Sequence, residues 1–376
     1  MEPTTPARAL VSTGVAMLIM FGAGAAAVPG TSAVADPARP SGTSTTTQAS
    51  ETTSTVVLAR RHHHRKHHRR HHVRHHRRHH TTVRTSSVHL ATTGRYSGAV
   101  NTSSLDAVNS AYQTSFAPGL NVPMGFTGDE SRCMAGTSSA QSRAATLRAI
   151  NFVRSLAGLA PVSFSPTLNN RAQLTALMMS ANRAVSHTPP RSWRCYTSTG
   201  AANAGRSNLL LSYPEITAAG VVQLYTTDPG SNNGAAGHRR WLLNPFATAM
   251  GSGSTRAANA ITVIGPTSAS RANPSYVSWP TAGYFPNTLE PGGRWSLSAG
   301  NRAVSFSQAA VSVSRNGTPI RTVRNRVENG YAQPTLVWQI PADQARSGTY
   351  RVVVRGIRLG SQQYTSSYTV RMFAPR

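Results

Sequence analysis

The chain has 376 residues, which leaves room for two ordered domains together with tails. Its formal net charge is +27 with only 11 acidic residues, and such a basic excess favours anionic partners through long-range attraction. Downstream of the N-terminal segment no run is apolar enough to span a bilayer, which argues against a protein with several membrane spans. The part that we expect to fold carries no nucleic-acid-binding motif, so the charge alone does not indicate nucleic acid as its partner.

The first 35 residues have the order of a secretory signal peptide. Arg8 precedes an apolar run at residues 9–28, and Ala33-Val34-Ala35 supplies the small residues of a cleavage site. We therefore expect cleavage near Ala35, a secreted or cell-envelope protein, and no membrane span after cleavage. The run at 9–28 is also about long enough to cross a bilayer, so an uncleaved anchor is the alternative.

Residues 36–125 are rich in Ser, Thr, Ala, Pro and Gly, and we predict a disordered arm because this composition buries too little apolar surface. Within it, residues 60–80 contain nine Arg or Lys, eleven His and no acid. Neutral imidazoles in this tract can chelate transition metals, and its arginines can bind polyanions. The third interpretation is a solvated cationic linker.

The chain has two cysteines, Cys133 and Cys195. In an oxidising, exported setting one disulfide is the simplest pairing, and closing a loop of this length stabilises the fold by about 4 kcal/mol in the chain-entropy model. Two unpaired buried thiols are the alternative. A metal site built from both is disfavoured because the Cys-x₂-Cys spacing is absent.

After the arm we predict a domain at residues 126–268 that is mainly helical in its first half. Helical periodicity, Pro at the first turn and Gly stops indicate helices over residues 142–157, 166–184 and 214–225. Residues 228–234 have the composition of a loop, and residues 260–264 alternate as a strand does.

Residues 272–376 change to a β pattern. Asn316-Gly317 is a strong hairpin signal, and short strands with regular turns predict an immunoglobulin-like β-sandwich. Trp279, Trp295 and Trp338 are interpreted as core anchors, with a sugar-binding aromatic platform as the alternative. The strand signals lie at residues 277–279, 294–298, 310–314, 320–323, 336–340, 350–354 and 368–373.

Two histidines stand apart from the N-terminal low-complexity region. His238 lies in Gly-His-Arg-Arg-Trp-Leu-Leu-Asn-Pro at residues 237–245, and His187 lies in Ser-His-Thr-Pro-Pro at residues 186–190. Because each stands in a marked motif of a domain with few other titratable groups, we predict that they approach each other at one site. The alternative is that each is a hydrogen-bonded structural histidine.

The ordered set of motifs resembles the SCP/CAP superfamily (cysteine-rich secretory proteins, antigen 5 and pathogenesis-related proteins), in the bacterial form whose second motif reads GHRRW. The resemblance implies an α-β-α sandwich, so that the fold class is α+β. It also implies a cavity where two His and two Glu hold a divalent metal, with His187 and His238 at the His positions. The motifs are Ala149 to Arg154, Ala157 to Val162, Ser165 to Leu168, Ala172-Gln173, Ser186 to Thr188, Ser207 to Leu209, Gly237 to Pro245 and Met250 to Gly253.

The acidic positions of the family pattern do not carry over to this chain. Ser207 stands where the family commonly has Glu, and residues 221–227 contain no acid at the second position. Between residues 138 and 265 the only acids are Glu215 and Asp228, which we interpret as a helix-capping residue and a turn residue. Two histidines without a carboxylate make a weak zinc site, since catalytic zinc takes three protein ligands.

A binding role therefore outweighs an enzymatic one. In the cavity Ser207, Asn208 and Arg239 are the predicted ligand-binding residues, with His187 and His238 as a tentative zinc pair. Arg239-Arg240 beside Trp241 offers cationic and stacking surface, and solvent-facing arginines beside a core Trp241 are the alternative. We expect a non-catalytic module that needs no cofactor and binds an anionic cell-wall polymer, a lipid or a small ligand. The rival is a His-dependent extracellular hydrolase that uses His187 and His238.

Overall fold

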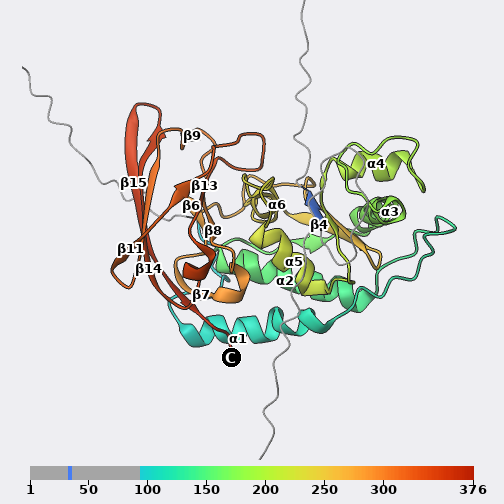
Figure 1. The fold of residues 1–376 in the computed structure, drawn as a ribbon, viewed down its shortest axis with the longest axis horizontal. Coiled ribbons are helices and arrows are strands. Elements are labelled where there is room, and N and C mark those ends of the chain that lie inside the picture. Colours follow the sequence, from blue (N-terminus) through green and yellow to red (C-terminus); the bar gives the residue numbers. More distant parts are fainter. Residues whose placement is uncertain (1–32, 36–93) are drawn as a thin grey trace, which may run out of the picture. The chain divides into compact units, whose positions relative to one another are not determined.

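The computed structural model in Figure 1 describes residues 33–35 and 94–376. The predictions for the segment before residue 33 and for the His/Arg tract at 60–80 lie outside the described residues. Among the residues that are described, no helix has the length and apolarity needed to cross a membrane.

The segment after residue 94 is ordered, so the prediction of a disordered arm reaching to residue 125 is wrong for its last part. Helix α1 (Leu105–Ser115) begins at Ser104, whose side chain accepts a hydrogen bond from the backbone of Ala107, and the 3-10 helix η1 (Ala117–Asn121) follows. Val108, Tyr112 and Phe116 recur every four residues and are buried. Tyr112 packs edge-on against Phe152 at 6.0 Å between ring centroids. The few apolar residues of this segment are enough to pack the helix against the core, because their spacing places them on one helix face.

The three predicted helices are present as α2 (Ala140–Leu156), α3 (Pro166–Asn182) and α5 (Ala218–Thr227). The third begins later than predicted, because Thr217 caps it by accepting a hydrogen bond from the backbone of Gly220 at 3.3 Å. Glu215 therefore lies before the helix, and the capping role that the sequence suggested for it is wrong. Two short helices were not predicted, α4 (Ser198–Ala204) and α6 (Gly237–Leu242).

A five-stranded sheet lies between these helices. Leu210 and Ile261 belong to a core cluster with residues of α2 and α5, whereas Leu209 and Ala260 belong to a second cluster with residues of α3. Alternate residues of the sheet thus pack against helices on opposite faces, which gives the α-β-α layering. The strand order is β1 (Ala33–Ala35), β3 (Ser207–Leu211), β5 (Ala258–Thr262), β4 (Ala249–Ser254) and β2 (Ser163–Phe164).

Glycines in β4 allow α3 to approach the sheet closely. A Cβ atom added at Gly253 would lie 2.1 Å from the backbone nitrogen of Gln173. Gln173 uses this approach to bridge the layers, because its side-chain amide donates to the carbonyl of Ser254 at 2.9 Å and accepts from the Ser254 backbone at 3.0 Å.

The C-terminal part contains two sheets. One has the order β11 (Thr318–Ile320), β10 (Ala310–Arg315), β14 (Gly348–Leu359), β15 (Gln362–Phe373) and β7 (Gly283–Pro286), with β9 (Val304–Ser305) also paired to β14. The other has the order β12 (Val323–Arg324), β13 (Thr335–Gln339), β8 (Arg294–Ala299) and β6 (Tyr276–Trp279).

The two C-terminal sheets face each other through aromatic residues. Trp295 of β8 packs edge-on against Tyr350 of β14 at 5.1 Å, and Trp279 and Trp338 are likewise fully buried. Their interpretation as core anchors is confirmed. The predicted hairpin at Asn316-Gly317 joins β10 and β11. The structure is thus a mixed helix-and-sheet protein with several sheets after the helical part, and the immunoglobulin-like topology stays a prediction.

One connected hydrophobic cluster runs through both predicted domains. It includes Ile150 of α2, Trp241 of α6 and Trp338 of β13. The helical part and the β part therefore share an apolar contact region, and α6 lies on this shared side.

Candidate functional site

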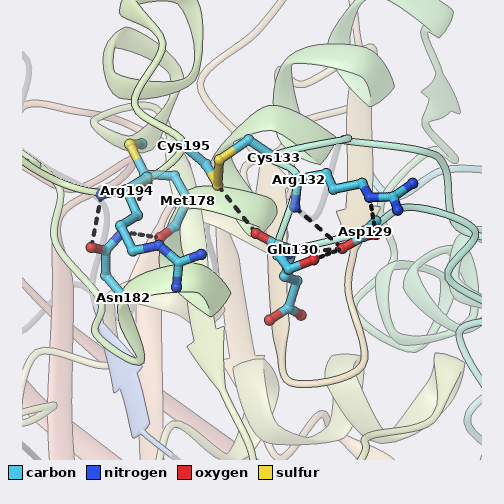
Figure 2. Close-up of a disulfide and its surroundings, with 9 residues drawn as sticks. Asp129, Glu130, Arg132, Cys133, Met178, Asn182, Arg194 and Cys195 are labelled. Atoms are coloured by element: carbon cyan, nitrogen blue, oxygen red, sulfur yellow. Dashed lines mark hydrogen bonds and ion pairs between the residues drawn. A yellow bond between two sulfur atoms is a disulfide. The ribbon is translucent and has the colours of Figure 1, made fainter.

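The predicted disulfide forms between Cys133 and Cys195, with Cα atoms 5.0 Å apart and a sequence separation of 62. Figure 2 shows that it links the turn at Asp129 and Glu130 to the segment that precedes α4. Beside it, the Asn182 side chain donates to the Arg194 carbonyl and accepts from the Arg194 backbone nitrogen, both at 3.0 Å. These two ties fix both ends of the loop that carries His187.

His187 lies in this loop, after α3, and is half-buried. Its Nδ1 atom is 2.9 Å from the carbonyl oxygen of Ala204, the last residue of α4. The contact holds the imidazole against the segment that leads into β3.

His238 lies in α6 and is fully buried. Its Nδ1 atom is 2.7 Å from the Oδ1 atom of Asp228, whose side chain is also fully buried. The imidazole stacks on the ring of Tyr225 at 5.3 Å between centroids, and its backbone carbonyl accepts a hydrogen bond from Asn208. His238 is thus held by an acid, an aromatic ring and the start of β3.

The role of Asp228 was missed by the sequence reasoning, which assigned this residue to a turn. It does end α5 in a left-handed conformation, with φ of 51°, but its carboxylate also points to the His238 ring. One feature of the sequence could have indicated this role. Asp228 is one of only two acids between residues 138 and 265, and it lies ten residues before His238.

Ser207 and Asn208 are both fully buried at the start of β3. The Ser207 hydroxyl donates to the carbonyl of Asn203 at 2.8 Å and accepts from the Asn203 side chain at 3.0 Å. The Asn208 amide nitrogen donates to the carbonyl of His238 at 3.1 Å. Both residues therefore hydrogen-bond within the protein, and their predicted ligand-binding roles stay predictions.

The two histidine motifs meet at one segment of the chain, residues 204–208. His187 contacts Ala204, and the backbone of His238 contacts Asn208. The prediction that both imidazoles reach one metal ion stays a prediction. Within residues 33–35 and 94–376, no three side chains of the His, Cys, Asp and Glu types cluster as a metal site.

Arg239 is buried in an ion pair, and its predicted ligand-binding role stays a prediction. Its side chain is 1% exposed, and its Nη2 atom lies 2.8 Å from Oε2 of Glu290 in an ion pair. The other nitrogens donate to the carbonyl of Thr226 and to the hydroxyl of Ser296. The sequence pattern suggested an exposed cation because it cannot reveal that the C-terminal part covers α6 on this side.

Glu290 was also missed, because it lies in the segment predicted as a β-sandwich. Its carboxyl is fully buried, and burial raises its pKa to about 8 although the neighbouring Arg239 acts in the opposite direction. Its Oε1 atom accepts from the backbone of Arg294 at 3.0 Å. The Arg294 guanidinium in turn donates to the carbonyls of Gly230 and Asn233, so β8 holds the loop after Asp228.

A second buried guanidinium, that of Arg154 in α2, holds the other end of the GHRRW motif. It donates to the carbonyls of Ala160 at 3.0 Å, Leu242 at 2.8 Å and Asn244 at 3.0 Å. Burial lowers the pKa of Arg154 to about 9, and the nearby Arg271 adds to this effect.

Among known proteins, one family model and one solved structure match parts of the chain. A solved structure that matches is PcoC, a methionine-rich copper resistance protein from Escherichia coli, at 18% identity over 26% of this chain and 93% of that chain. Its TM-score of 0.20 is too low for the likeness to bear on fold or function. No curated protein matches the chain. The model of the cysteine-rich secretory protein family, CAP, matches residues 147–264, which run from α2 to the end of β5 and contain both histidines. This part of the chain belongs to the SCP/CAP superfamily.

Proposed function

We propose that the chain is an exported, non-catalytic SCP/CAP protein that acts as a binding module at the cell envelope or outside the cell. Residues 60–80 serve in this proposal as a basic arm for a polyanion or a transition metal. Export is supported by the secretory character of the matched family and by the Cys133–Cys195 disulfide. The net charge of +27 supports an anionic partner such as a cell-wall polymer.

The observation that carries the non-catalytic role is the burial of the pair Asp228 and His238. Both side chains have zero exposure, and the Nδ1 contact of 2.7 Å joins the end of α5 to α6. A general base has to come within hydrogen-bond reach of the proton that it removes from the substrate. The His238 imidazole is inaccessible to a substrate and links two helices, which supports a structural role better than a catalytic one.

The rival is a hydrolase, and one observation favours it. An Asp bonded to the Nδ1 atom of a His is the arrangement that orients a catalytic base in serine hydrolases. Such a site also needs a nucleophile beside the imidazole. Ser207, which precedes the His238 partner Asn208 in β3, hydrogen-bonds to Asn203, so its use as a nucleophile requires this region to rearrange.

The two functions are separated by assays of the full chain on peptide and ester libraries, with and without Zn²⁺. We expect no turnover above the buffer blank in either condition. The matched variants are His187→Gln and His238→Gln, each checked for folding by circular dichroism. Turnover by the wild type that both folded variants lose would overturn the proposal in favour of the hydrolase.

The arm is tested by deleting residues 60–80 from the full chain. Its imidazoles gain charge below about pH 6.5, so retention on a polyphosphate matrix should strengthen from about pH 8 to about pH 5 and weaken with added salt. Ni²⁺ should bind best at the higher pH, where imidazoles are neutral. The deletion should abolish both behaviours and leave thermal unfolding nearly unchanged. Retention of both by the deleted chain would show that the arm is only a spacer.

A further inference from the structure

A pocket of about 360 Å³ lies beside α6, where the loop between β12 and β13 approaches it. This volume lies in the range of about 300–1,000 Å³ that is typical of small-molecule sites. Arg240 and Trp241 line it from α6, and Tyr331 and Gln333 line it from the loop, with Arg302 on the side of β9. Neither His187 nor His238 lines this pocket.

Gln333 is the unusual residue of this pocket. Its side chain is 2% exposed, and neither its amide oxygen nor its amide nitrogen has a hydrogen-bond partner among the described residues. Buried amides are almost always hydrogen-bonded, since leaving one unsatisfied is unfavourable. A partner that enters the pocket would satisfy both atoms.

The position of Gln333 is fixed in advance by Arg240. The Arg240 guanidinium donates to the backbone carbonyl of Gln333 at 2.6 Å and to that of Glu328 at 3.1 Å. It also lies over the ring of Tyr331, 4.8 Å from the centroid. The loop is thus clamped to α6. Because the two Gln333 amide atoms are buried, that side chain has to turn toward the pocket for a ligand to reach them, whereas the backbone around it is already fixed.

The charge around the pocket favours an anion. Arg302 is exposed and lines the pocket, and its guanidinium lies over the ring of Phe246 at 5.5 Å. No acidic residue lines the pocket, and Glu328 is the nearest acid along the loop. Arginine matches carboxylates through paired donors.

We propose that this pocket binds a sugar acid of monosaccharide size. The carboxylate would meet Arg302, and neighbouring hydroxyls, which both donate and accept, would satisfy the two atoms of the Gln333 amide. The sugar ring would lie against the aromatic wall that includes Tyr331. The inference names a ligand class for the binding role proposed above and rests on that role, but it does not depend on the arm.

The test is isothermal titration of the full chain with D-glucuronate, D-glucose, glucose 1-phosphate and N-acetylalanine. We expect glucuronate to bind more tightly than glucose by about tenfold, the effect of one charge-assisted contact. Equal or tighter binding of glucose 1-phosphate would overturn the carboxylate assignment. Tighter binding of N-acetylalanine would overturn the sugar assignment.

Variants locate the site. Q333L should weaken glucuronate binding about tenfold or more, while its melting temperature stays equal or rises because leucine leaves no unsatisfied amide. R302Q should weaken glucuronate to the level of glucose. R358Q, which changes an exposed arginine of β14, is the matched control and should leave the affinity unchanged.

Each failure has its own signature. Unchanged glucuronate affinity in Q333L and R302Q, or no binding of any probe to the wild type, would overturn the pocket assignment alone. If Q333L does not fold, R302Q and Tyr331→Ala still decide the matter through the same titration. Turnover of peptide or ester substrates would overturn the proposed non-catalytic function. The glucuronate affinities of Q333L and R302Q would still decide whether the pocket binds a sugar acid.

Discussion

The region around Arg239 and the region around Arg154 both contain a guanidinium that is almost completely buried. Arg239 is paired with a carboxyl, that of Glu290, at 2.8 Å. Arg154 contacts three backbone carbonyls, of Ala160, Leu242 and Asn244. No acidic side chain is among the described hydrogen-bond partners of Arg154, so the two guanidinium groups are buried in different ways.

The different partners of Arg239 and Arg154 show how the GHRRW motif is attached to the rest of the molecule. Arg239 reaches out of the SCP/CAP part to Glu290 and Ser296, so its ion pair joins the helical part to the β part. Arg154 stays within the SCP/CAP part and fixes the chain just after α6 to α2. An acid partner therefore joins the two parts of the molecule, whereas carbonyl partners stabilise one part internally.

The largest effect should follow from Arg239→Leu. The substitution leaves the Glu290 carboxyl buried without its partner and leaves the carbonyls of Thr226 and Thr227 without a donor. Removing one member of a buried ion pair destabilises a protein by about 3–5 kcal/mol. Chemical denaturation at about pH 9, where the Glu290 carboxyl with its pKa of about 8 is ionised in the wild type, should show this loss of unfolding free energy. Arg256→Leu, at an exposed arginine, should change it little.

The double variant Arg239→Leu with Glu290→Leu sharpens this result. With no buried charge left, we expect it to recover part of the loss, so that the two single effects do not add. Strict additivity in this cycle would mean that the ion pair does not couple the two parts.

Arg154→Met should have a smaller effect. Methionine fills much of the volume, but three buried carbonyls lose a charged donor, which corresponds to about 2–3 kcal/mol. The loss is smaller than for Arg239 because no buried charge is left behind. Arg148→Met, at an exposed position of the same helix, is the control for denaturation. A loss as large as that of Arg239→Leu would remove the distinction between the two regions.

Local patterns in the sequence predicted much of the fold. The helices α2 and α3 and most strands of the β part follow from periodicity, and the Cys133–Cys195 pairing follows from the cysteine count. Helix α1 was missed because its apolar residues are few, and their burial in the core, where Tyr112 packs on Phe152, depends on distant parts of the chain. Short α6 was missed because six residues carry too little periodicity.

The candidate site was harder to predict, because its partners come from distant parts of the chain. The motifs identified His187 and His238, but Asp228 looked like an ordinary turn residue. Glu290 lies 51 residues from Arg239 and in the other predicted domain, so no local pattern relates them. Whether a charged residue is exposed or buried depends on tertiary packing, and this is why Arg239 was predicted to face a ligand.

The last prediction separates the two regions by pH. The pKa of Glu290 is raised to about 8 from an ordinary value of 4.5, so the folded state binds more protons than the unfolded state between these values. The unfolding free energy should therefore fall as the pH rises from about 5 to about 8, by about 1 kcal/mol per pH unit from this group. In E290Q this contribution to the slope should be absent.

Arg154 should act in another window and with the opposite sign. Its pKa is lowered to about 9 from 12.5, so above pH 9 the unfolded state binds the proton more strongly. The difference in unfolding free energy between the wild type and Arg154→Met should then shift in favour of the wild type as the pH rises from about 9 to about 10.5, and should stay constant between about pH 5 and pH 8. Urea titrations of the wild type, E290Q and Arg154→Met across both windows measure this. The fall in unfolding free energy between about pH 5 and pH 8 is assigned to the Glu290 carboxyl. This assignment would be contradicted if E290Q kept the fall or if Arg154→Met lost it.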